Sequence, residues 1–238
     1  MATARFTFHA ELSGFLPREW RQQSFFADCA RAATLKNAIE ALGVPHTEAA
    51  QLRVNGQAAT LARIVRDGDE IEVFPWSWPQ SPPAQGFVAD AHLGGLARFL
   101  RMLGYDTIHH NGIADAEIRR LASEEWRLVL SRDKELLKCR EIAQGCYVHA
   151  LKPEEQLREV AARYRLAERA RPFTLCLHCN LPLAAAVKED VAARLPARVA
   201  ERHTQFMRCP GCDRVYWPGS HYARMQAVLR RLVPPLPP

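Results

Sequence analysis

The chain lacks any long hydrophobic run. None of its segments approaches the roughly 18 consecutive apolar residues that a membrane-spanning helix needs. Residues 1–8 also lack a basic region followed by an apolar stretch, so the N-terminus does not resemble a signal peptide. These two absences argue against an integral membrane protein and against a secreted one, and we expect the protein to act in the cytoplasm.

The chain also lacks the cysteine pattern of a secreted, disulfide-rich domain. Such domains are short and usually hold an even number of cysteines, whereas this chain has seven among 238 residues. In a reducing compartment, cysteines in C-x-x-C pairs indicate metal ligands instead. The three cysteines outside such pairs, Cys29, Cys139 and Cys146, are predicted to be ordinary buried residues.

A compositional bias toward disorder is absent as well. The hydrophobic fraction of 48% and the charged fraction of 24% are ordinary for a globular protein. The net charge of +6 arises in the C-terminal part, where residues 171–238 hold ten Lys and Arg against four Asp and Glu. A local excess of positive charge favours contact with phosphates, and a solvated basic surface is the alternative explanation.

Proline clusters divide the chain, which has no internal repeat. The segment from Pro75 to Pro83 cannot sustain a helix or a central strand and is predicted to be a linker, and the proline-rich tail from Pro234 onward is predicted to be frayed. The predicted boundaries are 1–78 for an N-terminal domain, 79–86 for the linker, 87–170 for a central domain and 171–238 for a C-terminal module.

The first 75 residues predict a small α+β domain. Strands are expected over Ala4–His9, Gln51–Val54 and Glu70–Phe74, a helix over Leu35–Leu42, and a hairpin turn at Asn55-Gly56. The segments Arg53–Gly56 and Asp67–Val73 resemble the β-grasp, ubiquitin-like fold, close to the small sulfur carriers of molybdopterin and thiamine synthesis.

Those carriers end in a free Gly-Gly tail, whereas here Phe74 runs into Pro75 and the chain continues. The resemblance therefore implies the β-grasp fold without sulfur-carrier chemistry. Binding of RNA or of a protein partner therefore stays open as the role of this domain.

After the linker, apolar strands alternate with amphipathic helices. Strands are expected over 87–90, 106–109, 127–130 and 146–151, and helices from 93 to 103, over 115–123, from 134 onward and over 153–169. This alternation predicts an α/β domain with a mainly parallel, doubly wound sheet and flanking helices.

Carboxylates follow several of these elements. Asp90 and Asp133 each come after an apolar strand, while Asp115 and Glu117 open a helix. In a doubly wound sheet the carboxyl ends of the strands meet at one edge, where gathered acids repel each other unless a cation neutralises them. Mg²⁺ or Mn²⁺ prefers such oxygen ligands and would ionise a water for in-line attack on a phosphodiester. Each acid also has an ordinary alternative role, as a helix cap or a favourable first-turn charge.

The central sequence resembles the Mut-seven C-terminal ribonuclease family, a branch of the PIN-like nucleases. The run Phe87–Asp106 is similar to the opening signature of that family, and Leu130–Asp133 is similar to its second signature, with Ser131 in place of the usual threonine. The resemblance extends from about Phe87 to about Arg230. It implies a PIN-like fold and a Mg²⁺- or Mn²⁺-dependent ribonuclease.

By this resemblance Asp90 and Asp133 are metal ligands, and Asp115 or Glu117 supplies a third. The sequence departs from many PIN nucleases because the segment 146–151 offers no fourth acid. The histidines His92, His109 and His110 lie near these positions in the sequence and receive no role.

Two C-x-x-C pairs in the C-terminal module predict a structural zinc site. Cys176, Cys179, Cys209 and Cys212 supply the four thiolates of a tetrahedral site, and His178 is a substitute ligand. The 29 residues between the pairs predict an inserted helix, expected at 189–195. A short module buries little core, so bound zinc would contribute to its folding.

Basic and aromatic residues surround the cysteine pairs, and together they predict contact with single-stranded RNA through phosphates and stacked bases. The basic residues are Arg171, Lys188, Arg194, Arg198, Arg202, Arg208, Arg214 and Arg224, and the aromatic residues are Phe206, Tyr216, Trp217 and Tyr222. Packing of Tyr216 and Trp217 on the cysteine loops is the alternative. The run 214–222 is also similar to the closing signature of the family.

The sequence thus predicts a β-grasp domain, a PIN-like nuclease sheet and a zinc ribbon that together cleave RNA with Mg²⁺ or Mn²⁺. One rival is a non-catalytic RNA-binding or adaptor protein with a degenerate nuclease site, which the low number of acids suggests. A second rival is a sulfur-transfer or redox protein, which the missing Gly-Gly terminus argues against.

Overall fold

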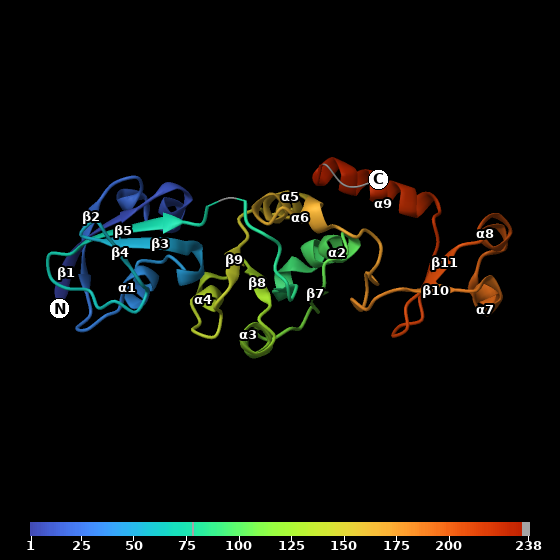
Figure 1. Cartoon of the computed structure of the whole chain (residues 1–238), viewed down its shortest axis with the longest axis horizontal. Helices are drawn as coiled ribbons and strands as arrows, with labels where there is room; N and C mark the ends of the chain where they lie inside the picture. The colour runs from blue at the N-terminus through green and yellow to red at the C-terminus, as the bar shows by residue number, and fades with distance from the viewer. Residues whose placement is uncertain (78, 235–238) are drawn as a thin grey trace. The chain divides into compact units, whose positions relative to one another are not determined.

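The computed structural model describes residues 1–77 and 79–234 (Figure 1). The chain forms two compact units, one of Met1–Trp78 with Ala114–Tyr147 and one of Pro79–Ile113 with Val148–Pro238. Each unit combines two separate stretches of the sequence. The boundaries predicted at 78, 86 and 170 stay a prediction. Trp78 of the predicted linker and residues 235–238 of the predicted frayed tail lie outside the described residues.

The first unit contains the N-terminal domain and a later segment with two helices and two strands. Its elements are β1 (Ala2–Phe8), η1 (Ala10–Phe15), η2 (Arg18–Trp20), β2 (Phe25–Cys29), α1 (Leu35–Ala41), η3 (His46–Glu48), β3 (Ala49–Val54), β4 (Gln57–Ala59), β5 (Glu70–Pro75), α3 (Asp115–Glu124), β8 (Leu128–Ser131), α4 (Lys134–Leu137) and β9 (Gly145–Tyr147).

The N-terminal domain is a five-stranded mixed sheet with α1 packed on one side (Figure 1). The strand order is β2-β1-β5-β3-β4, with β1 and β5 parallel and the other neighbours antiparallel. Phe6 and Ile71 from the sheet meet Leu35 and Ile39 from the helix in one apolar core. This is the predicted β-grasp arrangement.

Local sequence explains the boundaries of these elements. Thr34 and Asn37 form a capping box at the start of α1. Asn55 and Gly56 have φ angles of 51° and 76°, which places the predicted hairpin turn between β3 and β4. Two expectations were incomplete, because β2 was not predicted and β5 continues into Pro75, which we expected to begin the linker.

The later segment of the first unit contributes α3, β8, α4 and β9. The strands β8 and β9 pair in parallel, with Val129 opposite Gly145 and Ser131 opposite Tyr147. Helices α3 and α4 both pack against β8. The predicted succession of strand and helix is confirmed here, with β9 shorter than expected.

The second unit contains the remaining elements. They are β6 (Phe87–Ala89), η4 (Ala91–Leu93), α2 (Gly94–Met102), β7 (Thr107–Ile108), α5 (Pro153–Arg163), α6 (Leu166–Arg169), β10 (Ala184–Ala186), α7 (Lys188–Val191), η5 (Ala192–Arg194), α8 (Ala197–Arg202), β11 (Phe206–Arg208), β12 (Val215–Tyr216) and α9 (Ser220–Leu232).

A parallel strand–helix–strand motif leads this unit. The strands β6 and β7 pair in parallel, and α2 connects them and packs against α5. The predicted helix over 153–169 is divided into α5 and α6, because Arg165 adopts a left-handed conformation with φ of 46°. The parallel pairs in both units confirm the α/β class of the central region.

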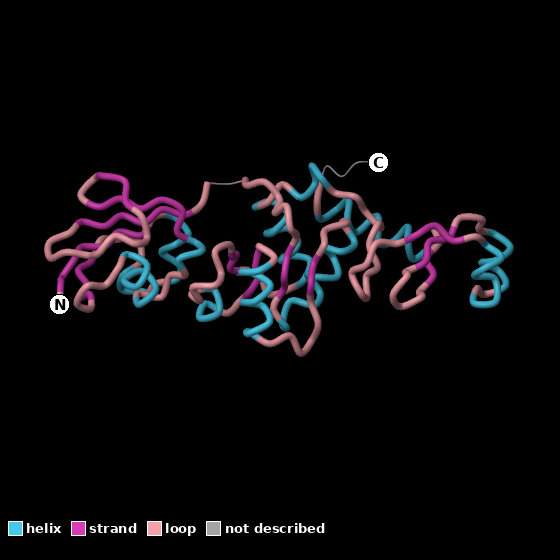
Figure 2. Tube along the Cα trace, turned by 60° about the horizontal axis from the view of Figure 1, so that its bottom comes forward, coloured by secondary structure: helices cyan, strands magenta, loops and turns pink. Residues whose placement is uncertain are grey.

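The C-terminal module is a three-stranded antiparallel sheet followed by α9. Its strand order is β10-β11-β12, and α7, η5 and α8 form the connection between β10 and β11 (Figure 2). The helix expected at 189–195 appears as α7 and η5, whereas α8 and α9 were not predicted. Among the described residues, no helix combines the length and apolar character needed to cross a membrane.

Candidate metal centre and nuclease residues

Two turns of the C-terminal module carry the four predicted zinc ligands. The first knuckle, 176–179, precedes β10, and the second knuckle, 209–212, connects β11 to β12. The Sγ–Sγ distances are 3.6 Å for Cys176–Cys212, 3.4 Å for Cys176–Cys179 and 3.1 Å for Cys179–Cys209. All four Sγ atoms lie within 4.8 Å of one another. The structure therefore brings together the four cysteines that the sequence singled out.

The spacing of these sulfur atoms fits a tetrahedral thiolate site. Four thiolates at a Zn–S distance of about 2.3 Å are separated by about 3.8 Å along each edge of the tetrahedron. The observed separations are slightly shorter, so a small outward movement of the side chains would suffice to accept the ion. A four-sulfur donor set suits zinc and is unsuited to a hard ion such as Mg²⁺.

Both knuckles repeat one backbone pattern. The amide of Asn180 donates to the carbonyl of Cys176 at 2.9 Å, and the amide of Asp213 donates to the carbonyl of Cys209 at 3.0 Å. Asn180 and Asp213 have φ angles of 64° and 59°, a left-handed conformation that Asn and Asp tolerate better than most residues. The polar residue that follows each C-x-x-C pair thus belongs to the turn, and the sequence carried this signal.

Hydrogen bonds stabilise Cys176 as a thiolate. Burial raises the pKa of this thiol, but hydrogen bonds from the backbone of Cys179 and from the Tyr216 hydroxyl outweigh burial and lower the pKa to about 6. The Tyr216 oxygen lies 3.2 Å from the Cys176 sulfur. Burial raises the pKa of Tyr216 and the bond to Cys176 raises it further, so Tyr216 is the donor. The thiolate is the form that binds a metal.

Arg101 joins the first knuckle to the strand–helix–strand motif. Its guanidinium donates to the carbonyls of Thr107 at 2.9 Å, His178 at 2.9 Å, His109 at 3.1 Å and Leu177 at 3.3 Å. The side chain is 6% exposed, and burial lowers its pKa, while nearby thiolates raise it. An arginine stays charged in proteins, so these four carbonyls face a permanent cation.

Asn180 and Gly104 complete the contact between the knuckle and this motif. The Asn180 side chain accepts from the amide of Thr107 at 3.0 Å and donates to Asp106 at 2.6 Å. Gly104, with φ of 87°, approaches the backbone of Arg171 so closely that a Cβ would overlap it. The cysteine module therefore packs directly on the end of α2 and on β7.

Asp90 lies directly after β6, as predicted. It is 7% exposed and precedes η4 without capping it through its side chain. His109 lies beside the same stretch, since its Nδ1 is 3.3 Å from the carbonyl of Ala89 and its ring packs on Gly94. His109 is thus a neighbour of the predicted Asp90 position, although the sequence gave it no role.

Asp133 follows β8 and caps α4. Its Oδ1 accepts from the amide of Glu135 at 2.8 Å, and its own amide donates to the buried Ser131 hydroxyl at 2.9 Å. The capping role considered for Asp133 is therefore present. It engages one carboxylate oxygen and leaves the other able to bind a ligand.

Asp115 and Glu117 occupy the first turn of α3. The residue that caps this helix is Ala114, so the alternative in which Asp115 is the N-cap is wrong, while the first-turn position of Glu117 is confirmed. Asp115 is exposed and Glu117 is half-buried.

The four predicted acids are divided between the two compact units. Within residues 1–77 and 79–234, the four cysteines are the only group of three or more potential ligand atoms within 4.8 Å. Asp90 belongs to one compact unit, and Asp115, Glu117 and Asp133 belong to the other. The acidic site stays a prediction.

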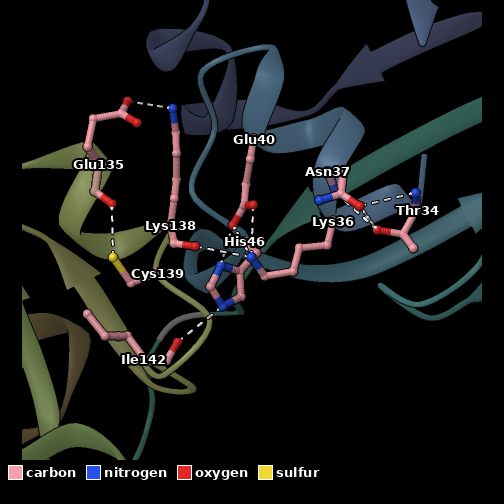
Figure 3. Close-up of polar contacts among 9 residues, drawn as sticks. All are labelled: Thr34, Lys36, Asn37, Glu40, His46, Glu135, Lys138, Cys139 and Ile142. Carbon is pink, nitrogen blue, oxygen red and sulfur yellow. Dashed lines mark hydrogen bonds and ion pairs between the residues drawn. The ribbon is translucent and has the colours of Figure 1, made fainter. Parts of the chain in front are cut away.

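The N-terminal domain packs on the segment that carries Asp133. Lys36 of α1 donates to the carbonyl of Lys138 at 3.1 Å and to Glu40 at 2.7 Å. His46, which is 8% exposed, lies between Glu40 at 2.7 Å and the carbonyl of Ile142 at 3.1 Å (Figure 3). Because a carbonyl oxygen only accepts, Nε2 of His46 is the donor to Ile142.

Further contacts widen this interface. Glu48 accepts from the amide of Tyr147 at 2.7 Å. Lys134 lies 5.0 Å from the centre of the Phe15 ring, and Phe15 meets the Tyr147 ring edge-on at 5.1 Å. Gly145 lies beside Thr47 and Leu137, and a Cβ there would overlap the Leu137 side chain and press on Thr47. The β-grasp domain is therefore built into the same compact unit as α3, β8, α4 and β9.

Comparison with known families decides the identity of the chain. The sequence profile described as Mut7-C RNAse domain matches residues 85–229, and the profile described as Mut7-C ubiquitin matches residues 1–81. The chain belongs to the Mut7-C family. The resemblance seen in the opening and second signatures is thereby confirmed.

Solved structures similar to this Mut7-C protein match its N-terminal third. The small archaeal modifier protein 1 of H. volcanii is 24% identical and covers 32% of this chain and 100% of its own, with a TM-score of 0.27. A putative molybdopterin converting factor subunit 1 from Pyrococcus furiosus is 16% identical and covers 32% of this chain and 100% of its own, with a TM-score of 0.25. The comparison with curated proteins gave no match.

Two features of this Mut7-C chain were not predicted from the sequence. Arg101 follows Ala97 by four residues, so a charged side chain on the apolar face of α2 was the available signal. The interface of Lys36 and His46 left no such signal, because its partners are backbone carbonyls about 100 residues away.

Proposed function

We propose that this Mut7-C protein is a metal-dependent ribonuclease that hydrolyses phosphodiester bonds of single-stranded RNA. The observation that carries the proposal is the match of the Mut7-C RNAse domain to residues 85–229. The positions of Asp90 directly after β6 and of Asp133 after β8 support it, since active sites of α/β sheets form at the carboxyl ends of strands.

Asp90 and Asp133 would hold the catalytic ion, with Asp115 or Glu117 as a further ligand. These are oxygen donors of the kind that Mg²⁺ or Mn²⁺ prefers. When bound, such an ion polarises the phosphodiester and supplies hydroxide from a bound water. The low exposure of Asp90 keeps its carboxylate at a fixed position, and the cap on α4 orients Asp133.

The ion of the four-cysteine site is zinc in this proposal, and its role is structural. Four thiolates leave no open position for a substrate or for water. The basic residues of the C-terminal module would hold the RNA strand. The β-grasp domain is a candidate for binding a protein partner, and a reducing cytoplasm would keep the four thiols available to the ion.

Cleavage of end-labelled single-stranded RNA tests the catalytic proposal. The purified protein would be assayed with Mn²⁺, with Mg²⁺ and with EDTA, beside Asp90→Asn and Asp133→Asn. We expect metal-dependent cleavage that falls by at least about a hundredfold in both variants, because each would lose a ligand of the ion. Glu124→Gln is the matched control, since Glu124 ends the helix that Asp115 begins and pairs with Arg120 on the surface.

One further candidate is an RNA-binding adaptor with a degenerate nuclease site. The low number of acids in the sequence favours it, since the segment 146–151 offers no fourth acid. If wild type and both Asp variants bind RNA equally and none cleaves it with either metal, the nuclease proposal fails and the adaptor replaces it.

A further inference from the structure

The cysteine module holds a large apolar pocket beside its zinc ligands. The pocket has a volume of 650 Å³. Strands β11 and β12, the start of α9 and the residues before the first knuckle supply its walls. Among its lining side chains are Phe173, Met207, Tyr216, Trp217, Tyr222 and Met225. We call this feature the aromatic pocket.

The aromatic pocket has the properties of a binding site. The six side chains named above are all half-buried, so they keep apolar surface in contact with solvent. Ligand sites have volumes of roughly 300 to 1,000 Å³ and combine apolar walls with a few polar groups. Gln205, Ser220 and His221 supply polar groups at the border of the pocket. Exposed apolar surface gathered at one concave place marks an interaction site.

Charge identifies the class of ligand. Arg198, Arg214 and Arg224 directly neighbour the lining residues Val199, Val215 and Met225 in the sequence, and all three arginines are exposed. No ion pair with a described carboxylate involves them. By contrast, Asp213 pairs with both Arg194 and Arg208. Cationic side chains around an apolar aromatic pocket suit a ligand with a flat apolar face and a phosphate backbone.

We propose that the aromatic pocket binds an unpaired nucleobase of the RNA strand. This inference rests on the proposed function, because it names the part of the molecule that holds the substrate. The base stacks on an aromatic ring of the pocket, its polar edge meets groups such as Gln205 or His221, and the neighbouring arginines contact the flanking phosphates.

The pocket is coupled to the metal site through Tyr216. The ring of Tyr216 lines the pocket, and its hydroxyl contacts the sulfur of Cys176 at 3.2 Å. An ion bound by Cys176 fixes this sulfur and with it the position of the tyrosine ring. A zinc ion held by the four cysteines would therefore stabilise the wall of the pocket as well as the two knuckles.

Binding of two fluorescent oligonucleotides to the zinc-loaded full chain tests the proposal. One is a decamer of uridines and the other has the same length and charge but abasic sites in place of the bases. Both are measured without added Mg²⁺ or Mn²⁺, with gels to verify that the strands stay intact. We expect the base-bearing strand to bind at least about tenfold more tightly, since stacking of one base on an aromatic side chain contributes this much.

Variants of the pocket residues test whether the tighter binding of the base-bearing strand arises in the aromatic pocket. Trp217→Ala and Tyr222→Ala should each weaken binding of the base-bearing strand about tenfold and leave binding of the abasic strand unchanged. Trp126→Ala is the matched control, because Trp126 is 61% exposed and lies in the other compact unit. Zinc content and circular dichroism of each variant verify folding, and quenching of a 2-aminopurine base by the wild-type protein reports stacking without any substitution.

Equal affinity for the two strands, or no loss in either pocket variant while the fold is intact, overturns the nucleobase assignment and leaves an apolar peptide as the occupant to be sought. These outcomes differ from failure of the proposed function. A protein that discriminates the strands but never cleaves RNA retains the pocket and loses the nuclease, and the reverse result retains the nuclease alone.

Discussion

The β-grasp domain and the cysteine module have similar sizes but opposite sources of stability. The β-grasp domain has a continuous apolar core, in which Phe6, Leu35, Ile39 and Ile71 are at most 1% exposed. In the cysteine module, by contrast, the aromatic, Leu, Val and Met side chains that line the aromatic pocket are all only half-buried. A domain of the first kind is stabilised by hydrophobic burial, whereas a module of the second kind would depend on the ion proposed for its four-cysteine site.

The two regions nevertheless contact the central segments in the same chemical way. On one side, Lys36 and His46 donate to the carbonyls of Lys138 and Ile142. On the other side, Arg101 donates to four carbonyls, two of them in the first knuckle. In both contacts a side-chain nitrogen satisfies backbone carbonyls of another segment, and a buried carbonyl left unsatisfied would cost about 1–3 kcal/mol.

Removing the metal should have the largest effect, because it should unfold the cysteine module and leave the β-grasp domain folded. Chelation of zinc, or Cys209→Ser, should unfold the cysteine module, because structural zinc contributes about 10–16 kcal/mol in small zinc domains. Limited proteolysis with mass spectrometry should find new cleavage sites within 171–234 and none within the β-grasp core. Cys139→Ser is the control, since Cys139 lies outside the ribbon. A ribbon that stays protected without metal would refute its dependence on zinc.

A cavity in the β-grasp core should destabilise the β-grasp domain and leave the cysteine module intact. Ile39→Ala removes three carbon atoms from a position that is 0% exposed, and we expect a loss of about 2–5 kcal/mol in the free energy of unfolding. Ile39→Val should cost only about 0.5–1.5 kcal/mol. Urea unfolding measures both, and a competition assay should find the zinc affinity unchanged. Weaker zinc binding in Ile39→Ala would mean that the two regions are coupled.

Loss of Arg101 should weaken the attachment of the first knuckle. Arg101→Met replaces the aliphatic stem but removes the donors to four carbonyls. Three of these bonds are only part-buried, so water can replace the lost donor there, and we expect about 1–3 kcal/mol of destabilisation in total together with weaker zinc binding. Arg101→Lys should restore only part of the effect, because lysine lacks the planar fork of donors. Thermal unfolding and zinc competition provide the measurements. Wild-type behaviour of Arg101→Met would show that the knuckle needs no such attachment.

Acid should weaken the β-grasp interface by a smaller amount. Burial raises the pKa of Glu40, but hydrogen bonds from His46 and Lys36 lower it below its ordinary value of 4.5. A carboxyl group whose pKa is depressed on folding contributes stability above its unfolded pKa, and this contribution is lost as the pH falls through the folded pKa. Glu40→Gln should therefore cost on the order of 1 kcal/mol at pH 7 and flatten the decline in stability below pH 4.5. An unchanged acid profile in Glu40→Gln would assign that decline to other groups.

Local chemistry determined what the sequence predicted well. The cysteine spacing, the Asn55-Gly56 turn and the helix over Leu35–Leu42 each depend on a few nearby residues, and the structure contains all three. The division of the predicted helix over 153–169 also arises locally, at Arg165, but no sequence rule requires a left-handed arginine there.

Long-range packing determined what the sequence missed. The partners of Lys36, His46 and Arg101 are carbonyl groups, and every residue type carries one, so no pattern in the sequence marks them. The same reason limits the predicted acids. The position of Asp90 and Asp133 after their strands is a local property, whereas the distance between two such carboxylates depends on how remote segments pack.

The interface of the β-grasp domain also determines the order in which parts of the chain can fold during synthesis. Lys36 and Lys138 are 102 residues apart, and His46 and Ile142 are 96 apart. At a synthesis rate of about 5–20 residues per second, the carbonyl partners are synthesised roughly 5 to 20 s after Lys36 and His46. During this interval the nascent domain lacks these two carbonyl partners, so the side chains of Lys36 and His46 are more exposed to solvent than in the complete unit.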